Sequence, residues 1–451
     1  MNYDMTKGNE RKILFRFCIP LFFSCVCQQL YSVVDGVVVG RFISSDPVIS
    51  ENSLAAVGVS APVTMLFMAV AIGASIGVSV LLSQLFGAGK YERLKTATST
   101  ALITIFVLGI LFTALGRIFS NPILDLLNTP ASIYKDASAY LDIFIYGIIF
   151  LLLYNICSGV FTSLGNSKTP LYLLFGSSVL NIVLDLVFVI CFGFGVPGVA
   201  WATFLSQGLS AAVAFYLMYT VLKKLKTNEK FVIFSFQVLW DLCRLAIPSI
   251  LQQAFVAVGN LFVQRIINVY DPASIAGFFS ALKLNSFAVS SYMSVANGIS
   301  SFTAQNYGAN KIKRVLSGIK SGAIILAFLS VPIAILTFVF APQLINIFLS
   351  QESVEAVAVG SQFLRYVSPF YPIIVIKVLF DSIFRGIGKM NYFMMSTLAD
   401  LILRVMLSYV MSSYFGLLGI SYAWIIGWLV AAALATTFFF NIKSKYLCIK
   451  E

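Results

Sequence analysis

The sequence predicts an all-α polytopic membrane protein with about twelve transmembrane helices in two six-helix lobes, related by a parallel pseudo-two-fold repeat. Hydrophobic residues make up 59% of its 451 residues and charged residues only 11%, whereas about a quarter of a soluble domain is charged. The apolar runs are also continuous over about 20 residues, which indicates helices, because barrel strands alternate apolar and polar residues. The third observation is a sequence match between the two halves of the chain.

The apolar runs give the expected transmembrane segments in chain order. Their bounds are 13–40, 53–84, 95–120, 136–163, 169–192, 196–222, 241–268, 275–306, 314–340, 356–386, 391–413 and 417–442. The first run follows a polar N-terminus, is too long for a signal peptide and lacks a small-residue cleavage site. We therefore expect it to be a membrane helix that is not cleaved.

Lys and Arg residues are concentrated in alternate connections between these segments. With the N-terminus inside, the outer connections hold only Arg41, Arg117 and Lys135, and the inner ones hold most of the other bases, Arg385 among them. This bias predicts a multi-pass protein of the cell membrane with both termini in the cytoplasm. It also accounts for the net charge of +12, so no nucleic-acid partner is expected.

The longest inner connection divides the chain into an N-terminal lobe, 1–222, a basic linker, 223–240, and a C-terminal lobe, 241–451. The lobes share several short motifs. Residues 83–90 match 304–311, 77–79 match 298–300, 18–20 match 246–248, 28–29 match 252–253, and Gly165 matches Gly388. Repeats of this kind are typical of transporters with a site between two lobes.

The composition excludes several kinds of catalytic and metal site. The chain has no histidine, and its seven cysteines include no C-x-x-C pair. Zinc–histidine sites, Ser-His-Asp triads and a disulfide framework are therefore not expected. We expect no enzyme activity and no cofactor.

The most informative stretch is 20–40, a transmembrane segment that contains a single acid, Asp35. A bare carboxylate in hydrocarbon costs at least a few kcal/mol. The nearest base, Arg41, lies six residues further on, about 9 Å along a helix. Asp35 is therefore either an acid that reaches the outer surface or a proton or cation site.

Several motifs together resemble the multidrug and toxic compound extrusion (MATE) family, over essentially the whole chain. They are Pro20, Gln28, Tyr31, Asp35–Gly36, Gly40–Arg41, 54–58, Gln84 with 87–90, Asn181-x-x-x-Asp185 and 198–203. The resemblance implies a monomeric antiporter that expels organic cations or drugs across the lipid bilayer in exchange for Na⁺ or H⁺. A flippase of lipid-linked precursors or polysaccharide units, from the same superfamily, is the alternative.

The resemblance is closer to the DinF-like branch of the family, and it implies an ion site in the N-terminal lobe. The matching positions here are Asp35, Asn181, Asp185 and Thr203, and Pro20 matches a proline at which the first helix bends. Counted at about 1.5 Å per residue, the two acids and Thr203 fall in the outer half of the bilayer. Oxygen ligands of this kind suit Na⁺ and protons, although a permanently protonated acid pair is the structural alternative.

Substrate contacts are expected from Gln28, Tyr31, Tyr140 and Tyr154, because aromatic and polar side chains suit large flat cations. In the C-terminal lobe, Asp400 and Arg404 are four residues apart and predict an ion pair in place of a mobile cation. Lys377 and Asp381 have the same spacing and are expected to pair or to reach the surface. Apart from Na⁺, no metal is expected. Lys283 and Arg365 also lie inside predicted segments, and the sequence assigns neither a role.

Overall fold

The computed structural model describes residues 4–43, 47–225, 227, 231–349 and 353–447, and this part of the chain is helical, without a β-strand. Within it, eleven helical segments are long and apolar enough to cross a membrane. α8, Pro272–Gly308, is long enough at 37 residues, but its many Ser and Asn residues leave it less apolar than the others. The predicted all-α, multi-pass fold class is confirmed.

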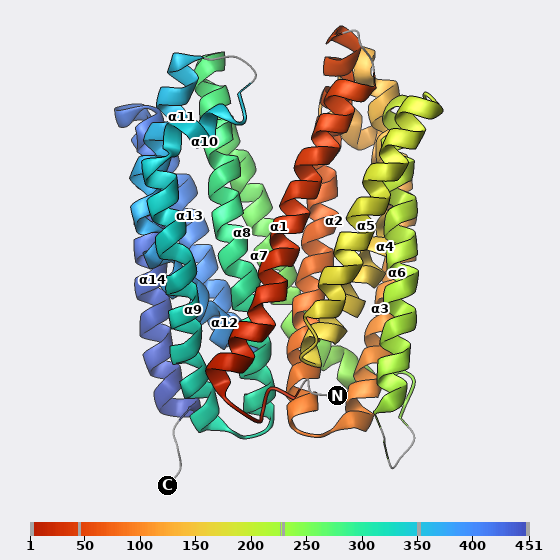
Figure 1. Cartoon of the computed structure of the whole chain (residues 1–451), viewed down its shortest axis with the longest axis vertical. Coiled ribbons are helices and arrows are strands. Elements are labelled where there is room, and N and C mark those ends of the chain that lie inside the picture. Colours follow the sequence, from red (N-terminus) through yellow and green to blue (C-terminus); the bar gives the residue numbers. More distant parts are fainter. Residues whose placement is uncertain (1–3, 44–46, 226, 228–230, 350–352, 448–451) are drawn as a thin grey trace. The chain divides into compact units, whose positions relative to one another are not determined.

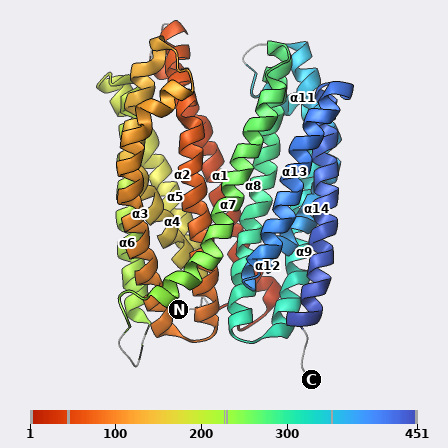
Figure 2. The ribbon, with the colours of Figure 1, turned by 180° about the vertical axis from the view of Figure 1, so that it is seen from behind.

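The N-terminal unit, residues 23–250, is compact (Figures 1 and 2). It holds α1 (Glu10–Phe42) from residue 23 on, α2 (Pro47–Gly87), α3 (Tyr91–Leu126), α4 (Ala131–Ser163), α5 (Lys168–Leu186), the π-helix η1 (Val187–Cys191), α6 (Gly195–Lys224) and the first part of α7 (Phe236–Ile267). α4 packs against α2, α3, α5 and α6 and is therefore the helix around which this unit is built.

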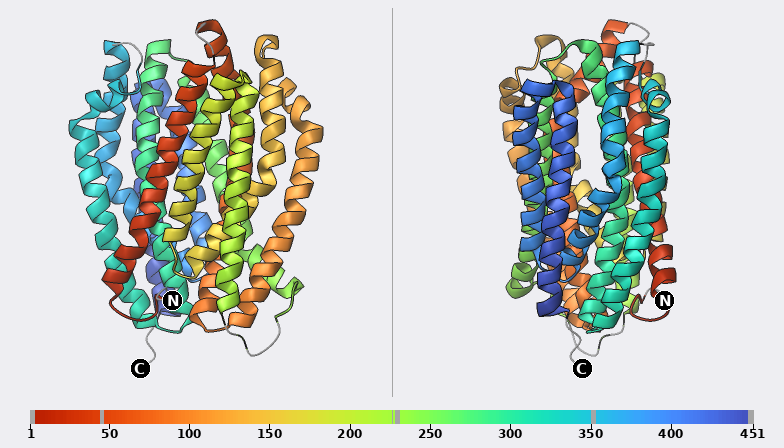
Figure 3. Two further views of the ribbon diagram at one scale, coloured as in Figure 1. Left: turned by 45° about the vertical axis from the view of Figure 1, so that its right-hand side comes forward. Right: turned by 90° about the vertical axis from the view of Figure 1, so that its left-hand side faces the viewer.

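The C-terminal unit, residues 4–22 and 251–447, is a second compact bundle. It holds the start of α1, the rest of α7, then α8, α9 (Ile312–Val339), α10 (Ala341–Asn346), α11 (Val354–Val367), the 3₁₀-helix η2 (Ser368–Phe370), α12 (Tyr371–Gly386), α13 (Met390–Phe415) and α14 (Leu417–Tyr446). α11, η2 and α12 follow one another as a single apolar segment. α13 and α14, blue in Figure 3, pack side by side.

Two helices, α1 and α7, pass from one compact unit to the other, so the units do not coincide with lobes divided at the linker 223–240. The reason is a pair of equivalent close contacts. A Cβ on Gly77 of α2 would lie 2.5 Å from Ala246 Cα in α7, and a Cβ on Gly298 of α8 would lie 2.8 Å from Cys18 Sγ in α1. Because small residues allow membrane helices to approach closely, the start of each helix packs on the other half of the chain.

The repeat is also visible in the turns. Gly89 and Asn310, which match in sequence, both have a positive φ, +69° and +56°. After each of them a lysine N–H closes the same six-residue turn: Lys90 bonds Leu85 O at 3.0 Å, and Lys311 bonds Asn306 O at 2.8 Å. These are C-caps of one type, and they satisfy the last carbonyls of α2 and α8.

The N-terminal segment before α1 is hydrogen-bonded to the rest of the C-terminal unit. Met5 is buried; its N–H donates to Gln305 Oε1 at 3.0 Å, and Arg314 donates to its carbonyl at 3.1 Å. Lys311 donates to Thr6 O at 2.8 Å. These hydrogen bonds explain why the first residues of the chain belong to the unit formed mainly by residues 251–447.

Candidate functional site

The two acids singled out from the sequence meet inside the N-terminal unit. Asp35 lies on α1 and Asp185 on the last turn of α5, and their carboxyl groups are within hydrogen-bonding reach of each other. Asp185 is fully buried, with 0% of its surface exposed, and Asp35 is partly buried. Two ionised carboxylates repel at this separation, so the contact is stable only with a shared proton or a cation.

Asn181 and Thr203 complete this polar cluster. Asn181 lies one turn before Asp185 on α5, is 1% exposed, and donates to Thr203 Oγ1 of α6 at 3.3 Å. With its amide turned over, Nδ2 donates to Asp185 Oδ2 at 3.0 Å while Oδ1 accepts the Thr203 N–H at 3.2 Å. The second orientation satisfies both ends of the amide, so it is the better assignment. The structure thus brings together all four residues predicted for ion coupling.

Two of the tyrosines predicted to contact substrate lie beside the acids. Tyr31, one turn before Asp35 on α1, lies close to Thr203 and to both carboxyl groups. Tyr140 of α4 also lies near both of them. Four helices, α1, α4, α5 and α6, therefore contribute side chains to one cluster.

The acid pair lacks a basic partner in the part of the chain that the structure describes. Neither Asp35 nor Asp185 forms an ion pair there with a Lys or Arg. Oδ1 of each carboxyl group is buried without a hydrogen-bond partner among the described residues. Buried oxygens of this kind favour a ligand that carries positive charge.

A layer of valines lies next to the cluster. Val38 and Val39 of α1, Val189 of η1 and Val199 of α6 are buried against one another. Each lies three or four residues along its helix from Asp35, Asp185 or Thr203. The π-helix η1 starts two residues after Asp185, and π-turns often occur at functional sites. The apolar layer keeps water from the acids on this side and strengthens their electrostatic interactions.

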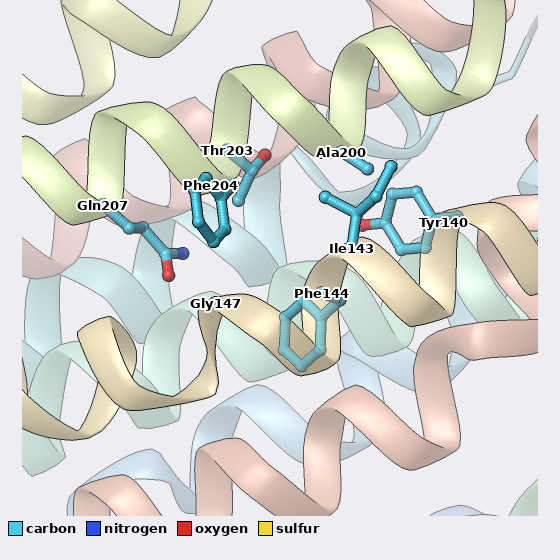
Figure 4. Close-up of a pocket in the computed structure, with 8 residues that line it drawn as sticks. All are labelled: Tyr140, Ile143, Phe144, Gly147, Ala200, Thr203, Phe204 and Gln207. Carbon is cyan, nitrogen blue, oxygen red and sulfur yellow. The ribbon is translucent and has the colours of Figure 1, made fainter. Parts of the chain in front are cut away.

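A narrow cavity lies beside Thr203, between α4 and α6 (Figure 4). Its lining is aromatic and polar: Tyr140, Ile143, Phe144, Gly147, Ala200, Thr203, Phe204 and Gln207. Tyr140 and Thr203 belong to both the cavity and the acid cluster. Gln207 was not predicted from the sequence; one turn after Thr203 on α6, it is the cavity's only amide.

The other predicted substrate residues lie elsewhere. Gln28 is exposed on α1, two turns before Asp35. The Tyr154 hydroxyl donates to Pro170 O at 3.4 Å and so links α4 to the start of α5. Pro20 is buried within α1, which continues as a helix through it. Their predicted roles in substrate binding and helix bending stay predictions.

In the C-terminal unit, the predicted ion pair between Asp400 and Arg404 is wrong. Within the described residues, these two side chains form no ion pair, although both are 7% exposed on α13. The guanidinium of Arg404 instead lies over the Trp424 ring of α14, 4.5 Å from its centroid. Asp400 Oδ1 packs beside Gly427, where an added Cβ would come within 2.8 Å. The aromatic ring of a neighbouring helix has replaced the carboxylate as the partner of the cation.

The buried ion pair of this unit joins Lys377 and Asp381 of α12, as their spacing allowed. Lys377 Nζ donates to Asp381 Oδ2 at 2.8 Å, and the two side chains are 2% and 1% exposed. Ser396 Oγ donates to Asp381 Oδ1 at 2.6 Å. Arg385, placed in an inner connection from the sequence, is buried in the last turn of α12 at 3% exposure.

A multi-pass helical protein with a repeated pattern of helices and a buried acid cluster belongs to the class of two-lobe membrane transporters. Comparison with known families agrees. The MatE family model matches residues 20–187 and 248–410, and the chain therefore belongs to this family of multidrug efflux transporters. The resemblance inferred from the motifs is confirmed.

Individual relatives and solved structures are similar over nearly the whole chain. The probable multidrug resistance protein YpnP of Bacillus subtilis (strain 168) is 29% identical over 425 residues, which cover 93% of this chain and 92% of that protein. A MOP superfamily transporter from Pyrococcus furiosus has a TM-score of 0.90 at 23% identity, covering 99% of each chain. An outward-facing multidrug resistance MATE family transporter has a TM-score of 0.90 at 24% identity, covering 98% of each chain. The two structures support the fold.

Proposed function

We propose that this chain is a secondary active antiporter that exports organic cations or drugs by alternating access, in exchange for Na⁺ or H⁺. The observation that carries the proposal is the buried contact between Asp35 and Asp185, which lacks a basic partner in the described structure. In this proposal the protein works as a monomer in the cell membrane, with both termini in the cytoplasm and without a cofactor.

The acid pair supplies the coupling. With both carboxylates ionised, the cluster carries a charge of −2 in a poorly solvated place, which is unstable. A proton shared between Asp35 and Asp185, or a cation held by their oxygens, removes part of this charge. An organic cation close to the acids does the same, so its binding competes electrostatically with that of the small ion. This competition is the basis of exchange.

The neighbouring residues hold the acids in position. Asn181 holds Asp185 through its amide, and Thr203 of α6 lies next to Tyr31 of α1. Carboxylate, amide and hydroxyl oxygens are the ligands that hard cations prefer. The aromatic lining of the adjoining cavity, Phe144 and Phe204, suits flat cationic ring systems.

The proposal is tested with purified protein in liposomes that have ethidium at equal concentration on both sides of the membrane. We expect an imposed inward gradient of Na⁺ or of H⁺ to drive ethidium against its own gradient, and one of the two ions to be effective alone. Ethidium movement that depends on neither the Na⁺ gradient nor the H⁺ gradient would contradict the antiport mechanism. Parallel liposomes with a fluorescent lipid-linked oligosaccharide test the flippase alternative, which predicts lipid movement without ethidium transport.

Replacing Pro20 by alanine is expected to slow transport more than it weakens drug binding. Proline removes one backbone hydrogen bond and disturbs the preceding turn, so it marks the place where α1 can bend. The unit boundary in α1 falls two residues after Pro20, and the boundary in α7 falls two residues after Pro248. We expect an approximately tenfold lower turnover with little change in the ethidium dissociation constant.

The matched control is Pro248→Ala, in the corresponding place of the repeat. α7 has no acid between its proline and its last residue, Ile267. Pro248→Ala should therefore affect turnover less than Pro20→Ala. Equal turnover in wild type and Pro20→Ala would rule out bending at Pro20 as a step of the transport cycle.

A further inference from the structure

Arg385 in the C-terminal unit has more hydrogen-bond donors than acceptors around it. Its Nη1 donates to Asn297 Oδ1 of α8 at 2.8 Å, and its guanidinium lies over the Phe393 ring, 5.2 Å from the centroid. Nε and Nη2 are buried without a hydrogen-bond partner in the described structure. Leaving a buried charged donor without an acceptor is strongly unfavourable, so these N–H groups are expected to bind an acceptor.

The charge around Arg385 is also unbalanced. Asp381, one turn before it on α12, is the nearby acid, but both of its oxygens are engaged, Oδ2 by Lys377 and Oδ1 by Ser396. Lys377, Asp381 and Arg385 together carry a net charge of +1. Within the described residues no carboxylate forms an ion pair with Arg385.

The unpartnered atoms lie on one edge of the guanidinium. Nε and Nη2 form the side-on fork that binds two oxygens of a carboxylate or a phosphate at once. Asn297 accepts a hydrogen bond from Nη1, at the opposite edge of the guanidinium, and is itself exposed. Arg385 is therefore buried, but it is in contact with a residue of the protein surface. Ser300 of α8, whose carbonyl packs against Gly386, has a second buried group without a partner, its Oγ.

We propose that Arg385, held by Asn297 and Phe393, is a binding site for an oxyanion group, a carboxylate or a phosphate. This group completes the fork at Nε and Nη2 and balances the excess positive charge of α12. It comes either from a free small anion or from the acidic group of a transported molecule. Only the second source rests on the proposed transport function.

The test for a free anion uses the purified full-length protein. Its melting temperature is measured against sodium phosphate and sodium acetate, with sodium chloride at equal ionic strength as reference. We expect a saturable rise with the oxyanions in wild type and at least a tenfold higher midpoint concentration in Arg385→Lys, since lysine keeps the charge but lacks the fork. Arg404→Lys is the control, because Arg404 is also buried in this unit, but among its nitrogens only Nε is fully buried without a hydrogen-bond partner in the described structure.

The test for an acidic substrate uses two dyes with the same cationic ring system. Rhodamine 110 carries a free carboxylate, and rhodamine 123 is its methyl ester. If the oxyanion belongs to the substrate, Arg385→Lys weakens rhodamine 110 binding at least tenfold in fluorescence anisotropy and leaves rhodamine 123 unchanged. If it is a free anion, neither dye is affected while the phosphate or acetate effect is lost.

Should Arg385→Lys fail to fold, Asn297→Asp gives an independent test. It leaves Arg385 in place and supplies a fixed carboxylate next to it, so the oxyanion effect on melting temperature should shrink. Chloride as effective as phosphate, or an oxyanion effect independent of both residues, would overturn the proposal.

Discussion

Replacing Asp35 by asparagine is expected to remove most ion-driven drug export while the protein still folds. Asparagine has nearly the same size but can neither share a proton with Asp185 nor supply negative charge to a cation. Coupling between two ligands is typically worth about 1–3 kcal/mol, so we expect coupled transport to fall by about one to two orders of magnitude. The measurement is gradient-driven ethidium transport in liposomes, together with ethidium binding in detergent.

The control for this variant is Asp142→Asn. Asp142 lies in the same unit and pairs with Arg117 at 2.8 Å, but the pair is partly exposed. Exposed pairs contribute about 0–1 kcal/mol, so neither stability nor coupling should change much. Wild-type transport in Asp35→Asn, at equal protein level, would refute a coupling role for the acid pair.

Asp185→Asn should have the same effect as Asp35→Asn, and the double variant should be no worse than either. Residues that act as one unit are non-additive, because removing either acid already ends the sharing of a proton or cation. Each variant is assayed for transport under the gradient that drives the wild type. Losses that multiply in the double variant would mean that the two acids act separately.

Much of this architecture follows from local sequence signals. Continuous apolar runs predict helices because every backbone group must be satisfied within lipid, and the basic turns mark their ends. The Schellman-type turns at Gly89 and Asn310 depend on six residues each, so the repeat is visible as a motif in both halves. The acids were also recognisable, because an unpaired carboxylate in an apolar helix is rare.

Contacts between helices were less predictable. The spacing of Asp400 and Arg404 puts them on one face of α13 but cannot reveal that Trp424, a residue of α14, attracts the guanidinium. From the sequence, Arg385 was expected in an inner connection, because basic residues near the end of an apolar run are usually at the membrane interface. Its burial depends on Asn297 and Phe393, which come from α8 and α13. The small-residue contacts of α1 with α8 and of α7 with α2 also join helices that are distant in the sequence. They too could not be predicted from local signals.

The ion pair between Lys377 and Asp381 leads to the largest expected effect on stability. Replacing Lys377 by methionine leaves the Asp381 carboxylate buried without its cation. Removing one partner of a buried pair typically costs about 3–5 kcal/mol, so the folded yield and the melting temperature in detergent should drop sharply. Lys283→Met is the matched control, since Lys283 is exposed on α8 with its ammonium 5.9 Å from the Phe348 ring centroid. A substitution at such an exposed position should change the free energy of unfolding by no more than about 0.5 kcal/mol.

The double variant Lys377→Met with Asp381→Leu should recover most of the loss, because replacing a buried ion pair by apolar residues of similar volume is often neutral or stabilising. The Ser396 hydroxyl, which donates to Asp381, also lies 3.1 Å from Phe393 O and keeps that acceptor in the double variant. Melting temperatures of the wild type, both single variants and the double variant form a complete cycle. If the double variant is as unstable as Lys377→Met, the loss comes from packing of the lysine stem and not from an uncompensated carboxylate. If Lys377→Met melts like the wild type, the ion pair contributes little to the stability of the folded protein.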